Sequence, residues 1–314
     1  MTDTIQGPTP LDVAEPNKDD LQLWSVTTVL GALHKEGLMY WACEQAANCA
    51  IDSEATWKAM LADDGREAAM KYIRDARLPS RMPKLQLSDA KMGTVVHALF
   101  EEYARTGNKP DRTAAEALVV NAGGPQLDVA TETNLVGVML NQFDGWLQRF
   151  TPQYIATEMT VYNPDYGYAG TLDAILAIQG IKFITDYKTT RKPRDAQGKP
   201  KTPWPDVGLQ LAAYRYCEFA AAWRARRYEK QFRRYYLLGE DERNIAVRIP
   251  AVETGLCIHV TPEACEAYPV RCDSLVDGDG YPLPESVFHQ FLDVQQAFRW
   301  LQETSRTVIK APLQ

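Results

Sequence analysis

Long hydrophobic runs are missing from this sequence of 314 residues. No apolar stretch approaches the roughly 20 residues that a membrane-spanning helix needs, so we expect no contact with a membrane. The first twenty residues are polar, contain Asp and Pro, and lack the apolar segment of a secretory signal peptide. We therefore expect residues 1–20 to form a flexible tail and the protein to act in the cytoplasm.

Closely spaced cysteine pairs are also missing. The chain has six cysteines, and none belongs to the tight C-x-x-C step that iron–sulfur ligation usually shows. We therefore expect no iron–sulfur cluster, and instead free, mostly buried thiols in a reducing compartment. The cysteines are Cys43, Cys49, Cys217, Cys257, Cys265 and Cys272.

The sequence has fewer basic than acidic residues. It contains 34 Lys and Arg against 41 Asp and Glu, which gives a net charge of −7. Taken alone, this argues against a partner as acidic as DNA. The distribution changes that conclusion, since the stretch from Lys188 to Arg234 holds 13 Lys or Arg and only 4 Asp or Glu. Such a stretch can neutralise backbone phosphates; the alternative is a solvated loop and helix end. The basic residues expected to contact DNA are Arg191, Lys192, Arg194, Lys199 and Lys201, and a second group follows at Arg224, Arg226, Arg227, Lys230, Arg233 and Arg234.

Residues 168–190 have the pattern of a β-hairpin. Two alternating apolar segments flank Gln179-Gly180, a pair suited to a two-residue turn. Counting back from that turn places Asp173 opposite Asp186, and like charges so placed repel unless a cation lies between them. Because side chains alternate along a strand, Lys188 lies on the same face as Asp186.

A third strand is predicted from Tyr154 to Tyr162, closed by a turn at residues 163–167. A four-residue loop would align Glu158 with Asp173, an assumed register. Helices are predicted at Lys91–Arg105, which carries His97 four residues after Gly93, and at Pro205–Ala221. In the second helix Gln210 and Tyr214 share one face.

Four motifs in this order resemble the PD-(D/E)XK nucleases of the RecB-like branch. They are Gly93-x-x-x-His97, Gly170-x-x-Asp173, Asp186-x-Lys188 and Gln210-x-x-x-Tyr214. The likeness is to phage-encoded RecB-like exonucleases, akin to the CRISPR-associated ones, and extends from about Trp24 to Trp300. Leu172 stands where the literal motif has proline.

The resemblance implies a role for each residue. His97, Asp173, Asp186 and the main-chain carbonyl of Tyr187 would bind metal, and Lys188 would act on the attacking water. Gln210 and Tyr214 would brace the lysine or the phosphate, and Glu158 would join the catalytic set. Carboxylate oxygens favour Mg²⁺ or Mn²⁺, and the imidazole makes Mn²⁺ as plausible as Mg²⁺. Such a cation neutralises phosphate charge and activates water.

Each of these residues also has an ordinary structural explanation that requires no catalytic role. Asp173 and Asp186 can lie on the solvated face of an ordinary hairpin, His97 can be a helix residue with satisfied hydrogen bonds, and Lys188 an exposed charge at a strand end. Gln210 and Tyr214 can be a surface amide and a half-buried ring. Trp204 and Tyr216 can stack on bases or belong to the core.

The expected fold class is α/β, with a restriction-endonuclease-like core in which helices flank a central mixed sheet. We expect a helical region at 21–150 contributing His97, a catalytic core at 151–230, and C-terminal strands and a helix at 231–314 that complete the same domain. Short strands are predicted at Tyr235–Leu238, Ile245–Ile249 and Leu256–Val260, and the helix contains Val287, Phe291, Val294, Phe298 and Leu301.

The function expected from the resemblance is a metal-dependent DNA exonuclease in phage recombination or repair, working in the host cytoplasm. A single-strand annealing recombinase would be a partner, and a homo-oligomer remains open. Two rival functions also remain: a structure-specific endonuclease on the same fold, and a non-catalytic DNA-binding protein.

Overall fold

The computed structural model describes residues 21–33, 36–75, 86–217, 219–220, 226–229, 234–237, 247–249, 251–252, 254–273, 278 and 283–308. Its helices are α1 (Val26–Leu30), α2 (Glu36–Asp52), α3 (Glu54–Asp63), α4 (Arg66–Asp75), α5 (Asp89–Thr106), α6 (Arg112–Ala122), α7 (Val129–Phe150), α8 (Val207–Arg215), α10 (Val287–Arg299), the π-helix at Trp300–Thr304 and α11 (Ser305–Val308). Its strands are β1 (Leu21–Ser25), β2 (Gln153–Asn163), β3 (Tyr168–Ile178), β4 (Ile181–Thr189), β5 (Phe219–Ala220), β6 (Arg226–Glu229), β7 (Arg234–Leu237), β8 (Val247–Arg248), β9 (Thr254–Val260) and β10 (Cys265–Val270).

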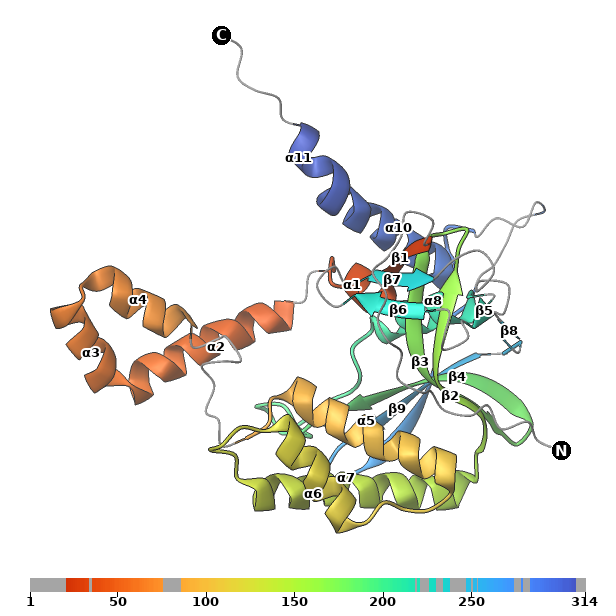
Figure 1. Ribbon diagram of the computed structural model, residues 1–314, viewed down its shortest axis with the longest axis horizontal. Coiled ribbons are helices and arrows are strands. Elements are labelled where there is room, and N and C mark those ends of the chain that lie inside the picture. Colours follow the sequence, from red (N-terminus) through yellow and green to blue (C-terminus); the bar gives the residue numbers. More distant parts are fainter. Residues whose placement is uncertain are drawn as a thin grey trace, which may run out of the picture.

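The strands form one mixed sheet in the order β10-β9-β4-β3-β1-β7-β6, with β2 on β3 and then β5 and β8 beyond it. Strand β4 is antiparallel to β3 and parallel to β9. Two helical layers cover the sheet, α5 to α7 on one face and α1, α8 and α10 on the other (Figure 1). The predicted fold class, a mixed sheet flanked by helices, is confirmed.

The predicted hairpin is confirmed in its turn and its register. Both Gln179 and Gly180 have positive φ, at +52° and +85°, as a type I′ turn requires. Pairing of β3 with β4 runs from Ile178–Ile181 to Ala174–Thr185, the register counted from the sequence. The loop between β2 and β3 has four residues, and the pairs Thr157–Ala174 and Met159–Leu172 place Glu158 beside Asp173.

Two predicted elements need correction. The region expected to be helical from residue 21 begins with strand β1, whose Leu23 is buried while Gln22 is exposed, and which pairs with β3 and β7. The helix predicted at Pro205–Ala221 ends at Arg215, because the chain turns there and Phe219–Ala220 pairs with β2.

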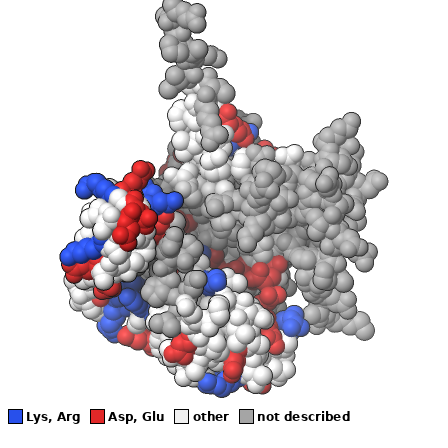
Figure 2. Space-filling model, turned by 60° about the vertical axis from the view of Figure 1, so that its left-hand side comes forward, with Lys and Arg blue, Asp and Glu red and all other residues white. Residues whose placement is uncertain are grey.

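Helices α2 to α4 stand apart from the sheet (Figure 1), and α3 has no buried residue among those described. On this side of the molecule, acidic and basic side chains are interspersed rather than sorted by sign (Figure 2). Of the cysteines, Cys217, Cys257 and Cys272 lie in the core and Cys43 is exposed. Within the described residues, no helix has the length and apolar character needed to cross a membrane.

Candidate active site

The two predicted carboxylates meet where the central sheet divides. Pairing of β3 with β4 ends at Ala174–Thr185, and pairing of the same edge with β1 begins only at Ala169–Ser25. Asp173 lies between these two stretches. Its carboxylate accepts a hydrogen bond of 2.6 Å from the backbone N–H of Tyr187 on β4. At this fork, the point where β3 leaves β4 and has not yet paired with β1, Asp173 lies against the segment that carries Asp186 and Lys188.

Strand β4 directs its side chains alternately into the two helical layers. Tyr187 packs edge-on against Phe100 and Phe143 of α5 and α7, and its hydroxyl lies 3.0 Å from that of Tyr154. Asp186 and Lys188 face α8 instead, and the Lys188 Nζ lies 2.7 Å from Asp186 Oδ2. Packing of the tyrosine in an aromatic core thus fixes the direction of both charged neighbours.

Helix α8 supplies the amide that joins these two charges. Gln210 Nε2 donates to Asp186 Oδ1 at 2.8 Å, and Gln210 Oε1 accepts from Lys188 Nζ at 3.1 Å. The Tyr214 hydroxyl lies 3.4 Å from the same Gln210 nitrogen. Both α8 residues are buried, so neither is the surface amide or half-buried ring of the structural interpretation.

Gly170 has a steric reason to be glycine. A Cβ placed there would lie 2.4 Å from Tyr214 Cε1 and 2.9 Å from its hydroxyl oxygen. The ring of Tyr214 therefore crosses β3 over a residue without a side chain. The motif Gly170-x-x-Asp173 thus combines a contact site for α8 with a carboxylate.

His97 approaches the carboxylates from the opposite layer. Its Nδ1 lies 3.8 Å from Asp173 Oδ2, and the ring packs edge-on against Tyr187. Gly93, one turn earlier on α5, allows the helix to approach β4, because a Cβ there would lie 3.3 Å from Thr189 Oγ1. The structure therefore gathers His97, Asp173, Asp186, Lys188 and Gln210 at one place.

The electrostatics of the site reflect two crowded carboxylates. Burial, and then the charge of Asp186, raise the pKa of Asp173 well above its usual value. Burial alone would lower the pKa of Lys188, but the charge and hydrogen bond of Asp186 outweigh it and raise the pKa, so the side chain is an ammonium at neutral pH. Burial lowers the pKa of His97 to about 4, which leaves a neutral imidazole able to donate a lone pair.

Glu158 lies on the strand beside Asp173 in a strained conformation. Its φ is +46°, the left-handed region, in the middle of β2. Its charge is one of those that raise the pKa of Asp173, after burial and Asp186. Backbone strain of this kind persists where the surrounding structure enforces it, and it is frequent at functional sites.

The donor set suits a hard cation. Asp186 Oδ2 is buried, and apart from the Lys188 ammonium 2.7 Å away it has no hydrogen-bond donor among the described residues. The site offers two carboxylates that repel each other and one neutral imidazole. These groups are suitable ligands for Mg²⁺ or Mn²⁺. In the described part of the chain, however, no three His, Cys, Asp or Glu side chains are drawn together closely enough to enclose an ion.

The comparison with protein families decides the affiliation. The family model described as the PD-(D/E)XK nuclease superfamily matches residues 66–303, which contain every motif residue named above. The chain belongs to the PD-(D/E)XK nuclease superfamily. No curated protein sequence matches it.

Solved structures add little to this assignment. One that aligns with the chain, titled "Crystal structure of SSO0001", is 14% identical over 68% of this chain and 74% of that chain, with a TM-score of 0.27. Similarity at this level carries no argument about fold or function. The affiliation with PD-(D/E)XK nucleases therefore rests on the family model.

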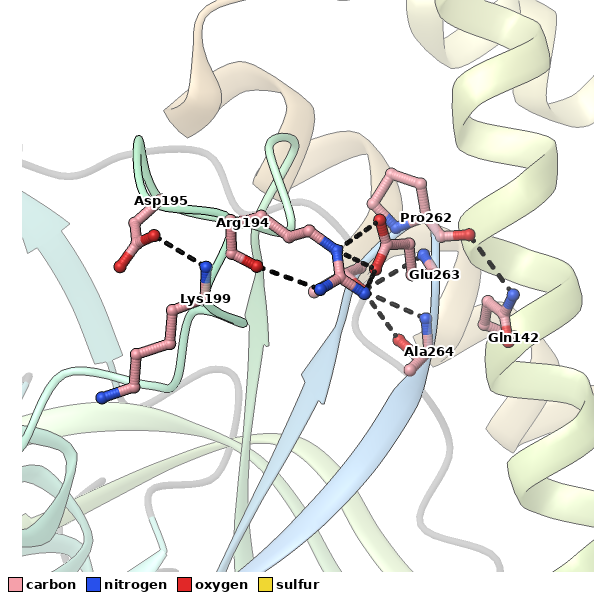
Figure 3. Close-up of polar contacts among 9 residues, drawn as sticks. Gln142, Arg194, Asp195, Lys199, Pro262, Glu263 and Ala264 are labelled. Carbon is pink, nitrogen blue, oxygen red and sulfur yellow. Dashed lines mark hydrogen bonds and ion pairs between the residues drawn. The ribbon is translucent and has the colours of Figure 1, made fainter.

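Two arginines of the basic loop after β4 are engaged within the protein. Arg191, expected to contact DNA, forms a buried ion pair with Glu132 of α7 and donates to the carbonyl of Leu87. Arg194 pairs at 2.8 Å with Glu263, in the turn between β9 and β10 (Figure 3). The guanidinium of Arg191 is largely buried in this PD-(D/E)XK nuclease, and its predicted contact with DNA stays a prediction.

The other basic residues divide into two groups. Lys192, Lys199 and Lys201 are exposed and have no ion pair with any described residue. The side chains of the second basic group, from Arg224 to Arg234, lie outside the described residues.

Sequence reasoning missed two buried polar residues beside the site. Glu132 is fully buried and also accepts from the backbone N–H of Leu87 at 3.1 Å. His259 of β9 is the register partner of Lys188, and its Nε2 lies 2.8 Å from Thr190 Oγ1. No local pattern marks either residue, since the partner of Glu132 is 59 residues away and that of His259 is 69.

Proposed function

We propose that this PD-(D/E)XK nuclease is a metal-dependent deoxyribonuclease that hydrolyses phosphodiester bonds at DNA ends. The observation that carries the proposal is the Lys188 ammonium, held between Asp186 and Gln210 and next to the Asp173 carboxylate. A lysine at this position serves phosphodiester hydrolysis, which needs a positioned water and a group that offsets the growing negative charge on the phosphate.

Asp173, Asp186 and His97 are the side chains that would hold the cation, with the main-chain carbonyl of Tyr187. The fit is supported by the buried Asp186 Oδ2, whose described partner is the Lys188 ammonium, and by the raised pKa of Asp173. When bound, Mg²⁺ or Mn²⁺ supplies neutralisation of phosphate charge and activation of water. Glu158 is proposed as a further carboxylate of the set, on the strength of its register and strain.

The remaining residues position groups. Lys188, as an ammonium, donates a hydrogen bond to the attacking water or to a phosphate oxygen, a role in positioning rather than as a base. Gln210 holds the lysine and the Asp186 carboxylate at fixed separation, because its two amide atoms bind one each. Tyr214 fixes Gln210 in turn, and its burial keeps solvent from the amide.

The preference for ends over internal sites comes from the resemblance to RecB-like phage exonucleases. That resemblance also supports a role in phage recombination or repair, with a single-strand annealing recombinase as partner. A structure-specific endonuclease and a non-catalytic DNA-binding protein remain the rival functions.

Digestion of end-labelled linear duplex DNA beside covalently closed circular DNA tests the proposal. The reactions contain Mg²⁺, Mn²⁺ or EDTA, with wild type, Lys188→Ala and, as the matched control on the same strand, Lys182→Ala. We expect metal-dependent loss of linear DNA only, abolished by Lys188→Ala and kept by Lys182→Ala. Cleavage of the circle would establish the endonuclease, and binding by folded protein without any metal-dependent cleavage would establish the non-catalytic alternative.

A further inference from the structure

Trp204 is a large aromatic side chain at the surface beside the candidate active site. It lies in the loop between β4 and α8, and 54% of it is exposed. Prolines precede and follow it in the sequence Pro203-Trp204-Pro205. Because proline fixes its own φ and restricts the residue before it, the backbone around the indole is stiff.

The indole lines a pocket of about 660 Å³, together with Val207, Cys257, Tyr268 and Val270. This volume lies within the range of small-ligand sites, roughly 300–1,000 Å³. The lining is mainly apolar and aromatic, so the pocket suits a flat, weakly polar group.

The pocket lies directly beside the catalytic residues. Cys257 is the register partner of Asp186 on the neighbouring strand, and paired strands are about 4.8 Å apart. Val207 precedes Gln210 by three residues on α8, so the two share one helix face. A group in the pocket would therefore lie close to a phosphate at Asp186 and Lys188.

The same loop also presents positive charge on an ordered framework. Lys199 and Lys201 are exposed and have no ion pair with a described residue. The loop that carries them is fixed, since Arg194 binds both Glu263 and the carbonyl of Gly198, and Asp195 accepts from the backbone of Lys199 (Figure 3). Grooves that bind single-stranded nucleic acid combine positive charges with exposed aromatic rings, and this loop carries both.

We infer that this pocket binds a nucleobase of single-stranded DNA, stacked on Trp204, while Lys199 and Lys201 contact the adjoining phosphates. The inference rests on the proposed function and specifies its substrate as a strand whose bases are unpaired next to the bond that is cut. Tyr216, the other aromatic candidate of this region, has one face of its ring covered by Phe288, with 4.4 Å between the ring centres.

Binding of oligothymidylate, measured by fluorescence anisotropy in EDTA so that the strand stays intact, tests the inference. We expect Trp204→Ala to weaken binding about 5- to 150-fold, the usual range for one base stacked on an aromatic ring. Trp204→Phe should retain most of the affinity. Trp300→Ala is the matched control, because Trp300 is 50% exposed but lies on the C-terminal helix, and it should bind as wild type does.

A base-free strand with the same number of phosphates separates stacking from charge. Wild type and Trp204→Ala should bind this strand equally, whereas Lys199→Ala and Lys201→Ala should weaken binding to both strands and reduce the salt dependence. Equal affinity of Trp204→Ala and wild type for oligothymidylate, or an equal loss on the base-free strand, would overturn the inference. If wild type still degrades linear DNA in Mg²⁺ in that case, the proposed function stands; if wild type neither binds nor cuts DNA, both fail.

Discussion

The backbone N–H of Tyr187 donates a hydrogen bond of 2.6 Å to the carboxylate of Asp173. Tyr187 is the residue between Asp186 and Lys188, so one peptide group joins the two carboxylate-bearing strands at the fork of the sheet. The side chain of the same residue lies in the aromatic core of α5 and α7. The position of Asp173 is therefore fixed by the packing of a core residue on the neighbouring strand.

Asp173→Asn should abolish metal-dependent cleavage and, in EDTA, stabilise the fold. Asparagine can still accept from Tyr187, but it brings no charge into the crowded site. Because the pKa of Asp173 is raised in the folded state, the folded protein keeps a proton that the unfolded chain releases above about pH 3.8, and stability is lost as pH rises. We expect a gain of about 0.5–2 kcal/mol at neutral pH, the usual size of a single stabilising substitution.

Thermal denaturation of wild type and Asp173→Asn in EDTA, at a series of pH values from acid to neutral, measures this gain. The difference between the two proteins should widen as pH rises. Asp165→Asn, in the exposed turn before β3, is the control and should show no such trend. A variant less stable than wild type at neutral pH would show that the carboxylate stabilises the metal-free fold.

Gln210→Leu should lower the rate of cleavage about 10- to 100-fold, the usual effect of removing a residue that orients metal ligands. Leucine has a similar size but can form a hydrogen bond to neither Lys188 nor Asp186, so helix α8 no longer holds the two charged groups in position. Steady-state rates with linear DNA, at several Mg²⁺ concentrations, would show the effect. Gln148→Leu, an exposed amide on α7, should leave the rate unchanged, and equal rates for all three proteins would remove Gln210 from the site.

The hairpin and its carboxylates could be predicted because their signals are local. The turn Gln179-Gly180 and the alternation of side chains set the register with no information from the rest of the chain. Strand β1 could not be found in this way, since its pairing with β3 and β7 joins segments more than 140 residues apart. The ion pair of Arg191 could not be predicted for the same reason, because its partner Glu132 is 59 residues away in sequence.

Gly170→Ala should destabilise the protein by about 1–3 kcal/mol, the usual cost of overpacking a core. The added methyl group would overlap the ring of Tyr214, which is buried and has no room to withdraw. Displacing that ring also disturbs Gln210, so activity should fall along with stability. Denaturant titration measures the first effect and digestion of linear DNA the second.

Gly145→Ala provides the control for that substitution. Gly145 lies within α7, where a Cβ would meet no atom within 4 Å, so alanine should stabilise the helix by up to about 1 kcal/mol. Opposite signs for the two glycine substitutions are the expected result. A Gly170→Ala protein as stable and active as wild type would show that Tyr214 moves without cost.

Arg191→Ala and Arg194→Ala should differ sharply, although the two arginines are neighbours in the same loop. Removing Arg191 leaves the fully buried Glu132 without its partner, and losing one member of a buried ion pair costs about 3–5 kcal/mol. Removing Arg194 breaks an exposed pair with Glu263, which contributes about 0–1 kcal/mol. Denaturant titrations of both variants measure these costs.

Arg191→Ala combined with Glu132→Leu tests whether the buried charge is the cause. The double variant should recover part of the stability lost by Arg191→Ala, because no charge is then left buried and unpaired. Arg194→Ala combined with Glu263→Leu should change little. If the first double variant is no more stable than Arg191→Ala alone, the loss arises from the missing hydrogen bonds to the backbone of Leu87, whose carbonyl binds Arg191 and whose N–H binds Glu132.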